Sequence, residues 1–235
     1  MNSAVWSQCQ VLLPDWIDAI FVDLPGHGSM AGVEACSIDD YVQALMPLVH
    51  RPVLWVGWSL GALAVMRLAN LYPERVAAML LVAATPCFVK RDDWQTAVDK
   101  QTFTQFAQAL EDNQAKTLTR FLSLQVKGLE QARETVKHLQ AAMAERGSAT
   151  SDALKNGLNI LLDSDYRDSL AAIKCPVSWY LGQRDTLVPV AIADVICQQY
   201  KHHQVTVEAH AGHIPFLSNP EKFIEALVKQ ASSLR

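Results

Sequence analysis

A serine lies between two glycines in the run Gly57-Trp58-Ser59-Leu60-Gly61. Gly-x-Ser-x-Gly arises by chance in about one chain in ten of this length, so its context decides its value. An apolar run precedes it and a helix-forming run follows, as in a nucleophile elbow. We expect Gly57 and Gly61 to relieve collisions on that tight turn. Ser59 is the predicted nucleophile and the Leu60 amide a predicted oxyanion donor; the competing interpretation is an inert serine at a helix start.

A serine nucleophile needs a base and an orienting acid, which this kind of site supplies downstream in the order Ser, Asp, His. Asp185 follows the apolar run 177–181, and His213 follows the run 205–209. Both positions lie where the carboxyl ends of parallel strands would meet. We favour His213 over His210 as the base, because Gly212 lets the loop turn and His210 is closer to the strand.

Other polar residues fit structural roles better. Asp23 and His27 precede Ser59, which is the wrong order for an acid and a base, and we expect them to organise a turn. His202 and His203 favour a solvated turn over a metal site. The chain has no glycine-rich phosphate loop and no zinc-spaced His/Cys set.

Five apolar runs predict the strands that position these residues, and the segment 52–57 is expected to be a central strand covered on both faces. Strand and helix patterns alternate, which predicts an α/β fold with a mostly parallel sheet and helices on both faces. Residues 88–168 carry a helical pattern and are predicted to form an insertion between two parts of one core, 1–87 and 169–235. The expected strands are 19–24, 52–57, 76–84, 177–181 and 205–209, and the expected core helices begin near 37, 60, 189 and 220.

The composition narrows the class of protein. The chain has 235 residues, half of them apolar, and a formal net charge of −4, which gives no electrostatic case for nucleic acid or anionic membranes. No segment is apolar enough to span a membrane. The five cysteines are widely spaced, and we interpret them as buried thiols in a reducing compartment. We therefore expect the protein in the cytoplasm. We also expect it to be a monomer.

With these residues in place, the chain resembles the alpha/beta-hydrolase superfamily, and within it the pimeloyl-[acyl-carrier protein] methyl ester esterases of biotin synthesis. The resemblance covers nearly the whole chain. It rests on the runs VDLPGHG (22–28), LWVGWSLGAL (54–63), PERV (73–76), TPCF (85–88), RFLSLQ (120–125) and HAGHIPF (210–216).

The resemblance implies a serine carboxylesterase in which Ser59, Asp185 and His213 act as nucleophile, orienting acid and general base. It implies a substrate made of a pimeloyl methyl ester carried by acyl carrier protein, and no cofactor. The residues implied to bind substrate are Trp58, Leu60, Phe121, Leu122, Ser123, Leu124 and Gln125.

The insertion also carries basic residues at helical spacing. Lys116 and Arg120 are four apart, as are Arg133 and Lys137, and Lys127 lies between the two pairs. Each pair would share a helix face and would suit an acidic carrier protein. A solvated helix surface is the alternative interpretation.

The chain departs from the superfamily at its start. Members normally begin with two or more strands and a His-Gly motif that supplies the second oxyanion donor, whereas the run from Met1 to Trp6 resembles the segment that follows this motif. We therefore expect Met1 to be an internal methionine of a longer protein. Losing one oxyanion donor typically costs about 10²- to 10³-fold in turnover. The alternatives are another carboxylesterase, a carbon-carbon hydrolase of the same fold, or a weakly active or non-catalytic relative.

Overall fold

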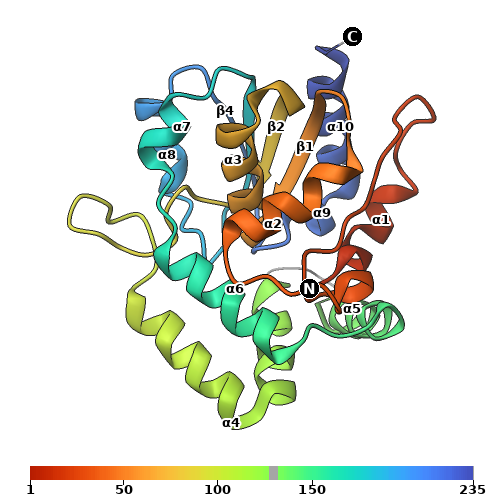
Figure 1. The fold of residues 1–235 in the computed structure, drawn as a ribbon, viewed down its shortest axis with the longest axis vertical. Helices are drawn as coiled ribbons and strands as arrows, with labels where there is room; N and C mark the ends of the chain where they lie inside the picture. The colour runs from red at the N-terminus through yellow and green to blue at the C-terminus, as the bar shows by residue number, and fades with distance from the viewer. Residues whose placement is uncertain (127–131, 235) are drawn as a thin grey trace.

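Among the described residues, four parallel strands form one sheet in the order β1-β2-β3-β4 (Figure 1). The computed structural model describes residues 1–126 and 132–234. Four of the five predicted strand runs form strands, which begin and end within two residues of the expected positions. Their bounds are Val53–Trp58 for β1, Val76–Val82 for β2, Val177–Gly182 for β3 and Gln204–Glu208 for β4.

Apolar layers cover both faces of the sheet because successive strand residues point to opposite sides. On β2, Met79 and Leu81 belong to one buried cluster, whereas Leu80 and Val82 belong to the other. The first cluster is covered by α2 (Ile38–Leu45), α3 (Leu60–Leu71) and α8 (Ile192–Gln199), and the second by α1 (Ser7–Gln10), α9 (Pro215–Ser218) and α10 (Pro220–Ser232).

The core helices follow the sequence pattern closely. Ser37 caps α2 in a capping box with Asp40, and α3 begins at Leu60, as expected. The remaining short elements are η1 (Ser3–Trp6), η2 (Gly28–Met30), η3 (Met46–Leu48), η4 (Pro73–Arg75) and α7 (Arg167–Ala171).

Two expectations about strands are wrong. Residues 19–24 belong to no helix or strand and pair with no strand among the described residues. β1, expected at the centre of the sheet, pairs only with β2 in the described part of the chain. A strand requires a neighbouring backbone as well as an apolar sequence, and the pattern of a segment does not specify that neighbour.

Helices α4 (Lys100–Gln125), α5 (Ala132–Arg146) and α6 (Ser151–Asp163) fall inside the expected insertion and lie together beyond the sheet (Figure 1). α4 is interrupted at Asn113, whose backbone is not helical and whose side chain accepts a hydrogen bond from the Lys116 amide. Asn113 therefore starts the second half of α4.

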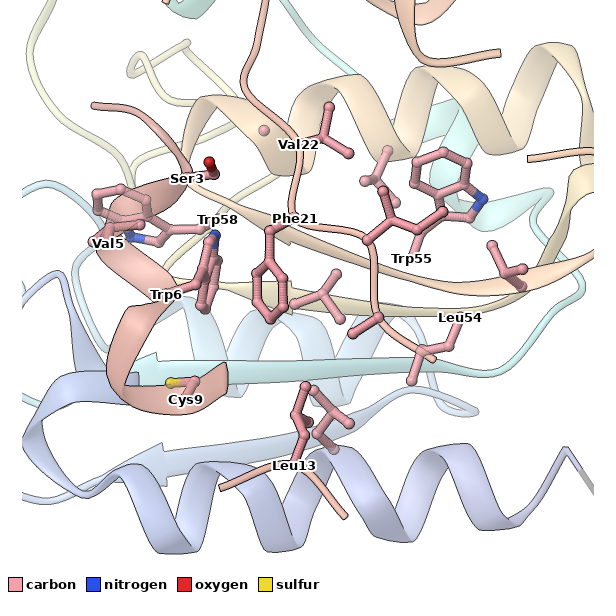
Figure 2. Close-up of a pocket in the computed structure, with 18 of the residues that line it drawn as sticks. Ser3, Val5, Trp6, Cys9, Leu13, Phe21, Val22, Leu54, Trp55 and Trp58 are labelled. Atoms are coloured by element: carbon pink, nitrogen blue, oxygen red, sulfur yellow. The ribbon is translucent and has the colours of Figure 1, made fainter. Parts of the chain in front are cut away.

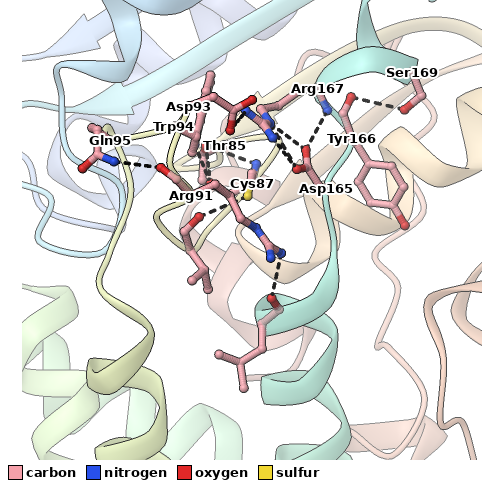
Figure 3. Close-up of polar contacts among 12 residues, drawn as sticks. Thr85, Cys87, Arg91, Asp93, Trp94, Gln95, Asp165, Tyr166, Arg167 and Ser169 are labelled. Atoms are coloured by element: carbon pink, nitrogen blue, oxygen red, sulfur yellow. Dashed lines mark hydrogen bonds and ion pairs between the residues drawn. The ribbon is translucent and has the colours of Figure 1, made fainter.

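Arg167 joins residues near both ends of the expected insertion (Figure 3). Its guanidinium forms ion pairs with Asp165 at 2.7 Å and Asp93 at 2.9 Å and lies 5.4 Å from the centre of the Trp94 ring. Trp94 is buried and donates to the carbonyl of Cys87. The chain entering the insertion and the chain leaving it are thus fixed to the same part of the core.

All five cysteines are free thiols. Cys9 and Cys87 are buried as expected, but Cys36 and Cys197 are exposed. Among the described helices, none combines the length and apolar character of a membrane span.

Candidate active site

Ser59 occupies a strained turn between β1 and α3. Its φ of 53° lies in the left-handed region, where a side chain is disfavoured, and its amide donates to the carbonyl of Val82 at 2.9 Å. A Cβ on Gly57 would lie 2.6 Å from the Cα of Ala62, so glycine is required there. A Cβ on Gly61 would meet no atom within 4 Å, and the expected collision at Gly61 is therefore wrong.

Asp185 lies in the loop after β3, and its side chain is almost completely buried. One carboxylate oxygen accepts hydrogen bonds from the amides of Leu187 at 2.8 Å and Val188 at 3.0 Å. The other oxygen is 2.7 Å from His213 Nδ1. These contacts fix the carboxylate so that it faces the imidazole.

His213 lies between the side chains of Ser59 and Asp185 and contacts both. Its Nε2 is 2.8 Å from Ser59 Oγ, and the ring is 2% exposed. The loop of His213 lies against β3, because a Cβ on Gly182 would overlap the carbonyl oxygen of Gly212. The structure thus brings together three residues that lie at the ends of three different strands. The arrangement can transfer a proton from a serine hydroxyl to an oriented imidazole.

His210, the alternative base, and His203 both make contacts away from Ser59. His210, with a φ of 66°, lies near the surface, and its Nδ1 is 2.9 Å from the Arg184 guanidinium. His203 accepts a hydrogen bond from the Trp179 indole, and burial lowers its pKa to about 4. No group of three or more potential metal ligands occurs in residues 1–126 and 132–234.

Asp23 and His27 organise the turn at residues 25–30, as expected. Asp23 is buried, and accepts hydrogen bonds from the amide and hydroxyl of Ser29, both at 2.8 Å. Burial opposes ionisation of Asp23, but hydrogen bonds from Ser3 and Ser29 hold its pKa below the ordinary value. Burial lowers the pKa of His27 to about 4.

The first residues of the chain contact the insertion, which the sequence did not predict. The amide side chain of Asn2 donates to the carbonyls of Met143 and Gly147, and Arg146 donates to the hydroxyl of Ser3 at 2.6 Å. Asparagine, serine and arginine are common surface residues, so their types carried no signal for these contacts.

Leu60 begins α3 and is half-buried. Its amide donates to no other residue in the described part of the chain and lies at the positive end of the helix. Gly157 of α6 lies over it, since a Cβ there would be 3.0 Å from the Leu60 side chain. Helix α6 therefore covers the turn that carries Ser59.

The run 121–125 at the end of α4 is divided between two environments. Leu122 and Gln125 are buried, and Phe121 packs against Phe106 with ring centres 5.2 Å apart. Ser123 and Leu124 are exposed. Neither amide atom of Gln125 has a hydrogen-bond partner among the described residues, although the residue is completely buried. A buried unpaired amide is costly and marks a position where a ligand or water would supply hydrogen bonds.

The four basic residues expected to contact a carrier protein are all exposed. Lys116 and Arg120 lie on α4, and Arg133 and Lys137 lie on α5. The two helices touch, and Gln140 of α5 donates to the hydroxyl of Thr119 on α4. Lys127 lies outside the described residues.

Comparison with known proteins agrees with this fold. The model of the alpha/beta hydrolase family matches residues 1–226. The chain is 33% identical over 235 residues to a pimeloyl-[acyl-carrier protein] methyl ester esterase of Proteus mirabilis, covering 100% of this chain and 90% of that protein. It is 34% identical over 228 residues to an esterase of the same name from Klebsiella pneumoniae, covering 97% and 88%.

Solved structures share the fold at low sequence identity. An esterase from Exiguobacterium antarcticum has a TM-score of 0.87 and 20% identity, covering 98% of this chain and 88% of that one. A bromoperoxidase from Bacillus anthracis has a TM-score of 0.79 and 19% identity, covering 88% and 79%. The strand order, the position of the serine turn and the family match lead to one assignment: the chain belongs to the alpha/beta hydrolase family.

Proposed function

We propose that this protein is a serine carboxylesterase with Ser59 as nucleophile, His213 as general base and Asp185 as the acid that orients His213. The hydrogen-bonded series Asp185, His213, Ser59 carries the proposal, with contacts of 2.7 and 2.8 Å. The burial of Asp185 and His213 supports it further, because a water-free environment strengthens such contacts.

The reaction would proceed in two acyl-transfer steps. His213 takes the proton of Ser59 as its oxygen attacks the ester carbonyl, and the negative charge that develops on the carbonyl oxygen is stabilised by the Leu60 amide. The protonated His213 then donates to the leaving alcohol. Water attacks the acyl-enzyme with His213 again as base, which releases the acid and regenerates Ser59.

The proposed substrate is the methyl ester of a pimeloyl chain on acyl carrier protein, with methanol as the first product. The names of the relatives support this substrate. The exposed basic residues on α4 and α5 also suit an acidic carrier. In this proposal, Trp58, Phe121, Leu122 and Gln125 contact the acyl chain or its ester groups, and the protein works as a monomer in the cytoplasm.

The nucleophile is tested by labelling the folded protein with a fluorophosphonate. Wild type should be labelled and Ser59→Ala should not. Absence of labelling in wild type with a normal melting curve would overturn the serine mechanism and favour a non-catalytic protein.

The substrate is tested by comparing carrier-bound pimeloyl methyl ester with short p-nitrophenyl esters. A much higher kcat/KM for the carrier-bound ester is expected. Equal or higher kcat/KM for the short esters would favour another carboxylesterase of this fold.

The proposed binding of acyl carrier protein to the basic residues of α4 and α5 is tested by reversing charge at Arg120 and Arg133. Both are exposed, so Arg120→Glu and Arg133→Glu should preserve the fold. We expect a KM increase of about tenfold for the carrier-bound ester and no change for a p-nitrophenyl ester. Lys201→Glu, an exposed reversal between α8 and β4, is the matched control. Unchanged KM in both arginine variants would remove these residues from carrier binding.

A further inference from the structure

The proposed base lies on a loop whose two ends are joined by a buried carboxylate. The histidine loop, residues 209–221, runs from the end of β4 through α9 into the first turn of α10 and contains His213. Glu208 is the last residue of β4 and is buried, and its carboxylate lies 2.9 Å from Lys222 Nζ. This ion pair therefore connects the residue before the histidine loop to the residue after it.

The same carboxylate oxygen is also fixed to the sheet. Glu208 Oε2 accepts a hydrogen bond from the hydroxyl of Tyr180 at 2.8 Å. Tyr180 lies on β3 and is completely buried. Burial and the neighbouring carboxylate raise the pKa of Tyr180 far above its ordinary value, so its hydroxyl keeps the proton and remains a donor. Glu208 thus links β3, β4 and α10.

The backbone of Glu208 lies where the loops of the proposed acid and base meet. Its carbonyl accepts hydrogen bonds from the amides of Gln183 at 3.0 Å and Ala211 at 3.4 Å. Gln183 is two residues before Asp185, and Ala211 is two residues before His213. A displacement of Glu208 would therefore be transmitted to both loops.

Lys222 occupies a position that α10 by itself does not favour. It is the third residue of this helix, where the positive end of the helix dipole disfavours a cation. The backbone amide of Lys222 caps the helix by donating to the Asn219 side chain at 3.2 Å, and this contact does not depend on the lysine side chain. The contact with Glu208 accounts for a cation at this position.

The middle of the histidine loop is held by contacts of another kind. Phe216 stacks on Trp6 with ring centres 4.1 Å apart and packs against Trp58. Figure 2 shows both tryptophans beside the pocket that they line. Apolar burial is not directional, whereas a hydrogen bond to a charged group restricts both distance and direction. The contacts of Glu208 are therefore the ones suited to fixing the ends of the loop.

We propose that Glu208 is a positioning residue that keeps His213 in contact with Ser59. Lys222 and Tyr180 hold its carboxylate in place. Among the described residues this carboxylate contacts those two side chains and none of the proposed triad, so it acts through the backbone of the loops. The inference rests on the proposed function, because it takes His213 as the base.

The test compares Lys222→Met with Lys222→Arg, using kcat and KM for a p-nitrophenyl ester. Methionine removes the charge and leaves the Glu208 carboxylate with one partner fewer. We expect kcat to fall about tenfold while KM changes less than about twofold, because a small displacement of the base affects the reaction more than ester binding. Arginine restores the ion pair and should recover most of the lost kcat. Lys90→Met removes the ion pair between Lys90 and Asp99 and is the matched control, with the kcat of wild type expected.

Glu208→Gln is the second variant and decides the question if Lys222→Met does not fold. Glutamine can still accept from Tyr180 but carries no charge, so a fall in kcat of the same order is expected. The double variant should be no worse than the more impaired single variant, because both changes remove one ion pair. Melting curves would measure the stability of each variant. Unchanged kcat in the folded single variants, or no recovery in Lys222→Arg, would overturn the proposal.

Failure of the proposed function would give a different result. If folded wild type neither hydrolyses the ester nor reacts with a fluorophosphonate, the serine mechanism is wrong, and the positioning role is overturned with it. If wild type is active and Lys222→Met and Glu208→Gln react with the fluorophosphonate as fast as wild type, only the role of Glu208 is wrong. Slower labelling of both variants at normal KM would support it.

Discussion

The indole N–H of Trp58 donates a hydrogen bond to the backbone carbonyl of His213 at 2.8 Å. Trp58 directly precedes Ser59, so this bond joins the serine turn to the histidine loop independently of the contact between the two side chains. The Trp58 ring also packs edge-on against Phe216, three residues after His213, with centres 5.5 Å apart. The distance between Ser59 and His213 is therefore held by the residue beside the proposed nucleophile.

Replacing Trp58 by Phe should loosen this connection. The aromatic packing is largely retained, but the His213 carbonyl loses its donor, which should cost about 0.5–1.5 kcal/mol of stability. We expect kcat for a p-nitrophenyl ester to fall about tenfold. Trp55→Phe is the matched control, because its indole donates to the carbonyl of Arg75 away from the site. Equal losses of kcat in the two variants would contradict the role given to Trp58.

Asp185→Asn should lower kcat by about 10⁴-fold, because an amide facing His213 Nδ1 favours the wrong imidazole tautomer. Stopped assays on purified protein would measure the fall in kcat, and a melting curve would verify that the variant is folded. Ser59→Ala should lose activity to a similar or greater extent, and the double variant should be no worse than the more impaired single variant, since the residues act as a unit. Additive losses would contradict the proposed cooperation.

Gly57→Ala and Gly61→Ala should behave differently, although both glycines belong to the same motif. A Cβ at Gly57 collides with the backbone of Ala62, which should cost about 1–3 kcal/mol or more and displace Ser59. At Gly61 the Cβ meets no atom within 4 Å, and alanine suits a helix better than glycine. Thermal unfolding and fluorophosphonate labelling of both variants would measure the difference. Strong destabilisation by Gly61→Ala would show that the turn is arranged differently.

His203 should make stability depend on pH. Burial lowers its pKa to about 4 from an ordinary 6.5, so the unfolded chain takes up a proton more readily than the folded protein. Its contribution is present above pH 6.5 and is lost as the pH falls from 6.5 through 4. His203→Asn keeps an acceptor for the Trp179 indole without titrating, and should make the decline in stability shallower. Urea unfolding at several pH values would measure the free energy of unfolding of each variant. His202→Asn, which changes the exposed neighbouring histidine, is the control. If the free energy of unfolding of His203→Asn depends on pH as it does in wild type, His203 is protonated equally in the folded and unfolded states.

Much of the fold could be read from local patterns. Apolar runs located β1 to β4, and the residues after three of them supplied Ser59, Asp185 and His213. The carboxyl ends of parallel strands lie at one edge of a sheet, so knowing where the strands stop was enough to predict that these residues meet. The capping box at Ser37 was equally local, because a cap involves residues three apart.

The tertiary structure decided everything that depends on a distant partner. Residues 19–24 have a strand pattern but no neighbouring backbone to pair with, and β1 has a central-strand sequence at the outside of the described sheet. The bond from Trp58 to His213 links positions 155 apart, and the burial of Gln125 beside the exposed Leu124 depends on how α4 packs. Spacing along a chain determines which way a side chain points within its own helix or strand. What that side chain meets is set by packing between elements, and only the folded structure contains that information.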